Sequence, residues 1–120
     1  MTKPATTIKF FEVYVLLTGA TLLLAPNILL SLFGLAEARE VWIRVLGVVV
    51  IALGYYYWCA AAADEQGFFK ATIPGRGFVL LAFIALVATG LAAPPLILFG
   101  VIDAAGALWT WMALRRAALL

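Results

Sequence analysis

The sequence contains no histidine, only one cysteine and few charged residues. Histidine is the commonest metal ligand, the usual axial ligand of haem and the side chain that most often carries protons near neutral pH. Its absence therefore argues against a metal centre, a haem site and any nucleophile that depends on a histidine base. The single cysteine, Cys59, has no second cysteine in the chain with which to form a disulfide. We expect neither a catalytic residue set nor a metal site.

Charge is scarce, and apolar residues take its place. Of the 120 residues, 12% are charged and 67% are hydrophobic, whereas a typical soluble domain is about 25% charged and about 45–50% apolar. A small soluble domain has too much surface for its volume to hide so many apolar side chains. The formal charge of +2 is too small a surplus to favour nucleic-acid binding. The composition predicts an all-α protein integral to a membrane, with membrane lipids among its partners.

Four apolar runs are long enough to cross a bilayer, because a membrane helix needs about 20 mostly apolar residues. They cover residues 8–31, 41–63, 77–93 and 95–114 of a single domain, residues 1–120. Pro26 should bend the first run, since proline removes a backbone donor. The connections at 32–40, 64–76 and 92–95 are short, so neighbouring helices should run antiparallel. We predict a four-helix bundle with up-down-up-down topology.

The basic residues predict the orientation of this bundle. With four spans, both termini and the connection at 64–76 lie on one side of the membrane, and positive charge collects on the cytoplasmic side. The side with the termini carries six basic residues and the opposite side two; these are Lys3, Lys9, Lys70, Arg76, Arg115 and Arg116 against Arg39 and Arg44. Both termini are therefore expected in the cytoplasm.

Four ionisable residues lie within the predicted spans or at their mouths: Glu12, Arg44, Arg76 and Asp103. A charge at the centre of a membrane helix costs about 2.5–3.5 kcal/mol on insertion scales, so each should have a structural or functional reason. Asp103 lies near the middle of the bilayer, at a depth of about 12 Å given the helical rise per residue. We expect Arg44 or Arg76 to reach inward toward Asp103, and Glu12 to take the remaining guanidinium or to lie in the interface.

Helical spacing indicates which side chains share a face with these charges, because residues three and four apart are neighbours on a helix. Thr110 shares the face of Asp103, and Tyr55 shares the face of Arg44 and is favoured over the two tyrosines that follow it. The candidate ligand-binding residues are Glu12, Arg44, Tyr55, Arg76, Asp103 and Thr110. The alternative is a buried salt-bridge network that only fixes the helix register.

Several segments resemble a known family. They are WIRVLG at 42–47 followed by IALGY at 51–55, GR at 75–76 before the third span, and DAAGALWT at 103–110. With a first helix that ends in proline, the chain is similar to small four-span bacterial membrane proteins of the DoxX-like group and its uncharacterised relatives. The resemblance implies a four-helix bundle in a bacterial inner membrane and, for some relatives, association with quinone-linked oxidoreductases. It brings no catalytic residue set.

The sequence leaves three functions open. The favoured one is a binding or accessory protein, whose interior accepts a lipid-like or quinone-like molecule or which packs against a partner membrane subunit; an apolar pocket with a few polar groups is the usual ligand site. The second is a homo-oligomeric small transporter or channel in which Glu12 or Asp103 exchanges protons. The third is an intramembrane enzyme in which these two acids act on an isoprenoid or sterol-like substrate. No cofactor is expected beyond a bound lipid or quinone.

Overall fold

The computed structural model describes residues 3–119, which form helices and short connections without any strand. The long helices are α1 (Pro4–Leu24), α3 (Trp42–Ala62), α4 (Gln66–Ala88) and α5 (Ile97–Arg116), and the short ones are α2 (Pro26–Leu32) and the 3-10 helix η1 (Pro94–Leu96). With η1 counted as the start of α5, four helices are long and apolar enough to cross a membrane. The all-α class and the four long apolar helices are thus confirmed.

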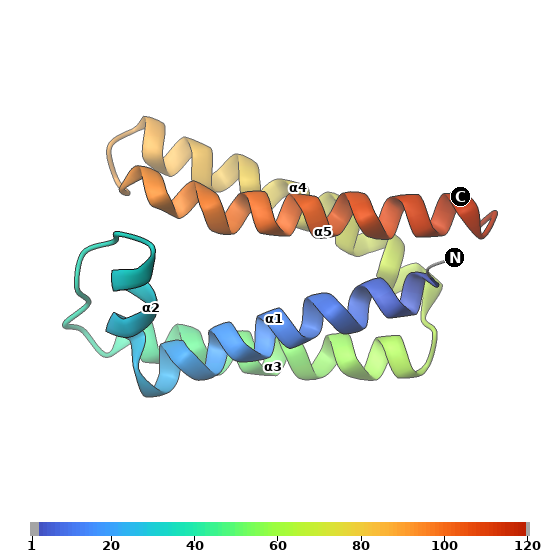
Figure 1. The fold of residues 1–120 in the computed structure, drawn as a ribbon, viewed down its shortest axis with the longest axis horizontal. Helices are drawn as coiled ribbons and strands as arrows, with labels where there is room; N and C mark the ends of the chain where they lie inside the picture. Colours follow the sequence, from blue (N-terminus) through green and yellow to red (C-terminus); the bar gives the residue numbers. More distant parts are fainter. Residues whose placement is uncertain (1–2, 120) are drawn as a thin grey trace.

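The long helices form two pairs, α1 with α3 and α4 with α5 (Figure 1). Glycine allows the first pair to approach closely. A Cβ atom on Gly47 would lie 2.6 Å from the backbone nitrogen of Leu23, and one on Gly19 would lie 2.9 Å from the backbone nitrogen of Ile51. No larger residue fits between backbones at these distances. Such small-residue contacts are the usual way in which membrane helices pack.

The two pairs are joined at both ends of the molecule. At the end where the described chain starts and finishes (Figure 1), all four long helices contribute to one small apolar core. Its buried members are Ile8, Ala60, Ala61, Phe69 and Leu114. At the opposite end Phe33, which follows α2, stacks on Phe99 of α5 with ring centroids 4.2 Å apart. Side-chain contacts therefore join the two pairs near either end.

The first helix breaks at Ala25, whose backbone angles of φ −150° and ψ 65° are not helical. Pro26 has no N–H to continue the hydrogen-bond ladder, and the last carbonyls of α1 need other donors. The guanidinium of Arg44 on α3 donates to the carbonyl oxygens of Leu23 and Leu24. The expected bend at Pro26 is confirmed, and the predicted run 8–31 consists of two helices.

The fourth helix begins earlier than the sequence suggested. Residues 64–76 were expected to form a loop before a span at 77–93, but α4 starts at Gln66 and continues through Pro74. The expectation of a loop is wrong because Phe69, Thr72 and Arg76, spaced by three and four residues, bury one helical face. Membrane helices tolerate proline because neighbouring groups satisfy the freed backbone atoms.

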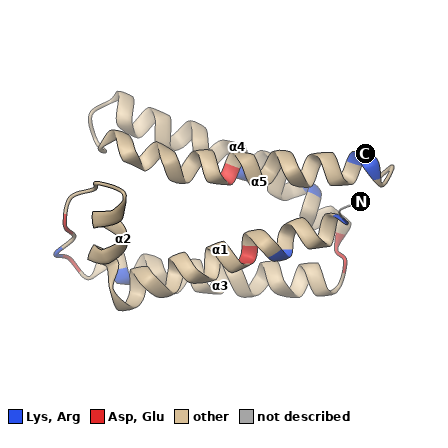
Figure 2. Cartoon of the chain, viewed as in Figure 1, with Lys and Arg blue, Asp and Glu red and all other residues tan. Residues whose placement is uncertain are grey.

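The outer surface of the molecule is strongly apolar. Large side chains such as Trp42, Phe78 and Leu81 are 68%, 68% and 67% exposed. Figure 2 shows long stretches of each helix without charge, with most charged residues near the ends of the helices or in the connections. A soluble monomer rarely exposes apolar area on this scale. The exposed apolar faces fit a membrane protein.

Candidate binding cavity

A cavity of about 450 Å³ lies between the two helix pairs. This volume falls within the range of about 300–1,000 Å³ that is typical of small-molecule sites. Its lining comes from α1 (Phe11, Tyr14, Val15, Thr18, Leu22), α3 (Ile43, Leu46, Val50, Leu53, Tyr57), α4 (Gly75, Arg76, Val79, Phe83), η1 with α5 (Leu96, Phe99, Asp103) and α2 with the loop after it (Leu29, Leu30, Leu35). Most of these side chains are apolar, so the cavity suits an apolar molecule.

A second hollow of about 400 Å³ adjoins the cavity on the side of α1 and α5. Tyr14, Thr18, Leu29 and Phe99 line both spaces. The two hollows therefore meet at these four side chains. Both hollows have α1 as a common wall.

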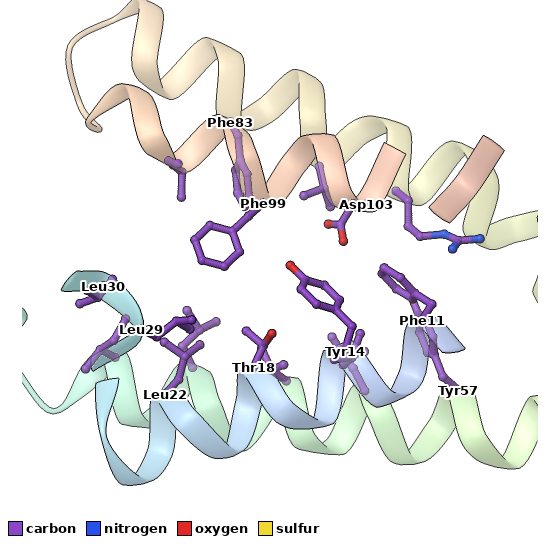
Figure 3. A pocket seen from close by; sticks show the side chains of 18 of the residues that line it. Phe11, Tyr14, Thr18, Leu22, Leu29, Leu30, Tyr57, Phe83, Phe99 and Asp103 are labelled. Carbon is purple, nitrogen blue, oxygen red and sulfur yellow. The ribbon is translucent and has the colours of Figure 1, made fainter. Parts of the chain in front are cut away.

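The polar groups of the cavity come from both helix pairs. Figure 3 shows the hydroxyl of Tyr14 on α1 and the carboxyl group of Asp103 on α5 pointing toward one another across the space. Asp103 is partly buried. None of the side-chain hydrogen bonds formed within residues 3–119 involves Asp103. Its carboxyl oxygens are thus acceptors that face the cavity without a protein donor.

Arg76 is a fixed cation beside the same cavity. Its side chain is only 2% exposed. Nε donates to the backbone oxygen of Thr72 at 3.2 Å, and Nη2 donates to the hydroxyls of Thr72 and Thr110 at 2.8 and 2.9 Å. The guanidinium carbon also lies 4.7 Å from the ring centre of Phe11, a cation–π distance. Nη1 has no partner among the described residues.

Thr110 connects this guanidinium to α1. Its hydroxyl lies 2.7 Å from the hydroxyl of Thr7, which in turn donates to the backbone oxygen of Pro4 at 2.7 Å. A hydroxyl has one proton, and Thr7 uses its proton for the bond to Pro4, so Thr110 must donate to Thr7. The oxygen of Thr110 accepts from Arg76. The chain of hydrogen bonds joins α1, α4 and α5 within a buried layer. This layer orders the polar end of the cavity.

The six candidate residues divide into three that belong to this end and three that do not. Arg76 and Asp103 line the cavity together, and Thr110 holds Arg76. The expected approach of an arginine to Asp103 is met only in part, because the hydrogen bonds of Arg76 go to threonines rather than to the carboxyl group.

Arg44 and Tyr55 lie outside the cavity lining. Arg44 is bound to the broken end of α1, and Tyr55 is 61% exposed. The expectation that these two side chains point into the cavity is therefore not met. The inward face carries Leu46, Val50 and Tyr57, so Tyr57 takes the place that was predicted for Tyr55.

Glu12 also lies outside the cavity lining, although it is 2% exposed. It belongs to the buried face of α1 with Ile8 and Val15. Its Oε2 atom has no hydrogen-bond partner among the described residues. The expected partnership of Glu12 with a guanidinium is not seen, since the partners of both inner arginines are backbone and threonine oxygens.

Sequence reasoning missed Tyr14, Thr18 and Phe99. Tyr14 and Thr18 are four residues apart and share a helical face with Phe11, which was the available signal. That face was overlooked because it lies beside the face of Glu12 and Gly19, which packs α1 into the protein.

Comparison with protein-family models, with curated proteins and with solved structures found no match. Residues 3–119 contain no group of three or more side chains suited to hold a metal ion. Any assignment of function therefore depends on the shape and chemistry of the cavity.

Proposed function

We propose that this membrane protein binds one lipid-like or quinone-like molecule between its two helix pairs. The observation that carries the proposal is the cavity of about 450 Å³, apolar over most of its lining and polar near Tyr14, Arg76 and Asp103. An amphiphilic molecule matches this division: its tail would lie against the leucine and valine side chains, and its polar end would reach Asp103. Burial of the tail supplies affinity, and the few polar groups fix its direction.

The same proposal includes the setting of the protein. We place it in a bacterial inner membrane with both termini in the cytoplasm. The six-to-two division of basic residues described above supports this orientation, and the start of α1 and the end of α5 lie at the same end of the molecule (Figure 1). Kinship with DoxX-like proteins is part of this proposal and is supported by the residue patterns alone.

The second hollow supports entry of the ligand from the lipid phase. A hydrophobic molecule is already concentrated in the bilayer, and Tyr14, Thr18, Leu29 and Phe99 line both that hollow and the cavity. Rotation of these side chains would open a path between α1 and α5 without unfolding of a helix.

Native mass spectrometry of protein released from mild detergent tests the proposal. Val79 on α4 lines the cavity, and Val79→Trp would place an indole ring in the space and narrow it. Leu81 on the same helix is 67% exposed, so Leu81→Trp is the matched control. We expect wild type and Leu81→Trp to carry a bound small molecule at equal occupancy, and Val79→Trp to carry it at clearly lower occupancy. Equal occupancy in all three proteins, or none in any of them, would contradict the proposal.

A further inference from the structure

The polar end of the cavity contains two charged side chains, Asp103 and Arg76. The carboxyl group of Asp103 faces the cavity, whereas the guanidinium of Arg76 is bound to other residues. Asp103 points into the space (Figure 3) and takes part in none of the side-chain hydrogen bonds formed within residues 3–119. Arg76 has three of its donors bound to Thr72 and Thr110. The cation is therefore fixed by neighbours other than the carboxyl group.

The packing around the guanidinium keeps it in this position. A Cβ atom on Gly106 would lie 3.1 Å from Nη1 of Arg76 and 3.2 Å from the ring of Phe11. The guanidinium thus fills the space that glycine leaves open on α5, with the ring of Phe11 against it. It cannot turn toward Asp103 without breaking the contacts with both threonines, so the acceptor sites of Asp103 stay available to a ligand.

The charge of the lining decides between kinds of ligand. Arg76 and Asp103 are the only lining residues that carry formal charge, and their charges are opposite. An anionic head group would meet the carboxyl group that projects into the space, while a cationic one would gain Asp103 but lie close to Arg76. In an apolar cavity both repulsions are weakly screened. An uncharged group that donates a hydrogen bond meets neither.

We infer that the ligand ends in an uncharged hydroxyl group, which donates to Asp103 beside the phenol of Tyr14. The inference rests on the proposed function and narrows it to neutral, hydroxyl-bearing lipids. A hydrogen bond from a hydroxyl to a carboxylate is about twice as strong as one between neutral groups, and the surrounding apolar wall strengthens it further. The hydroxyl proton should therefore contribute strongly to selection among amphiphiles with the same tail.

Four probes with one tail test this inference: 1-dodecanol, 1-methoxydodecane, dodecanoic acid and dodecylamine. The alcohol and the ether differ in the hydroxyl donor, and the acid and the amine supply the two charges. Binding is measured by competition in native mass spectrometry, for wild type and for Val79→Trp at equal probe and detergent. The excess of wild type over Val79→Trp is the cavity-specific part, which removes differences in partition.

For wild type we expect the affinity for dodecanol to exceed the affinity for the ether by at least about tenfold, because a hydrogen bond to a charged group contributes about 1.5 kcal/mol or more. The affinity for dodecanol should also exceed those for the acid and the amine. Asp103→Asn should reduce the preference for the alcohol over the ether by several-fold and raise binding of the acid. If Asp103→Asn fails to fold, the order of the four probes on wild type decides by itself. Tyr14→Phe should leave the alcohol ahead of the ether, by a smaller margin.

The outcomes separate the inference from the proposed function. The inference is overturned if the cavity binds the alcohol and the ether with equal affinity, or if it binds the acid or the amine more tightly than the alcohol. Either result leaves the cavity as a binding site. Absence of cavity-specific binding for all four probes overturns both. The alcohol in front on wild type, with its lead reduced in Asp103→Asn, supports both.

Discussion

Replacement of Thr110 by valine isolates the contribution of the buried hydrogen-bond layer. Thr110 is fully buried, and valine has the same shape without the hydroxyl. The substitution removes the acceptor of Arg76 Nη2 at 2.9 Å and the donor to Thr7 at 2.7 Å. It creates no cavity, so the polar contacts are the main quantity that changes.

The expected loss can be worked from these two contacts. Hydrogen bonds between membrane helices average about 0.6 kcal/mol and reach about 1.7 kcal/mol, while bonds to charged groups are worth about 1.5–3 kcal/mol. The contact of Thr110 with Thr7 belongs to the first class, and the contact with Arg76 belongs to the second. We expect Thr110→Val to lower the free energy of unfolding by about 2 kcal/mol.

Reversible unfolding by sodium dodecyl sulfate in mixed micelles, followed by circular dichroism, measures this loss. Thr110→Ser is the control, because serine keeps the hydroxyl and removes only a methyl group. A cycle with Thr7→Val should give a coupling energy of about 0.6 kcal/mol for the direct contact of the two hydroxyls. The reasoning would be refuted if Thr110→Val matched wild type or if Thr110→Ser lost as much as Thr110→Val.

Three further predictions concern the packing of the helices. Gly47→Ala should lower the free energy of unfolding by about 1–3 kcal/mol, since its Cβ atom would lie 2.6 Å from the backbone nitrogen of Leu23. The control Gly75→Ala, whose Cβ atom would have nothing within 4 Å, should stay near wild type in the same assay, and equal losses would contradict the close packing. Arg44→Met should cost about 1–3 kcal/mol because the carbonyls at the end of α1 lose their donor, and an unchanged unfolding midpoint would exclude that role. Phe99→Ala removes the ring stack that closes the cavity beside α2, so backbone hydrogen exchange in α2 should rise several-fold; unchanged exchange would show that the stack does not hold this end.

Composition alone was sufficient to predict the membrane class and the four long helices. An apolar run of about 20 residues in a small chain has few possible structures other than a membrane-spanning helix. Pro26 correctly indicated the break in the first helix, because loss of an N–H acts locally. Pro74 causes no such break, and α4 continues through it although residues 64–76 were expected to form a connection. There the burial of Phe69 and Arg76 on one face outweighed the local preference, and burial depends on helices that are distant in the sequence.

The sequence predicted the depth of some site residues along their helices better than the direction in which their side chains point. Asp103 lies far enough along its helix to reach the cavity, as counting residues indicated. Arg76 was expected at the mouth of a helix but lies within α4, because that helix begins at Gln66. The partners of Arg44 were predicted wrongly, because they are backbone carbonyls at the end of α1. Every residue has a carbonyl, so the sequence does not indicate which carbonyl will accept a hydrogen bond. The choice between Tyr55 and Tyr57 depended on the rotation of α3 about its axis. That rotation is set by close contact with α1 at Gly47, which spacing within one helix does not reveal.

Photolabelling tests most directly the claim that the ligand lies between the helix pairs. A dodecanol analogue with a diazirine in its tail would be irradiated with the protein in detergent, and the labelled residues mapped by peptide mass spectrometry. The account predicts labels on cavity residues of α4, such as Val79 and Phe83, and their displacement by excess dodecanol. Labels confined to the outer residues Phe78 and Leu81, which excess dodecanol does not displace, would contradict it.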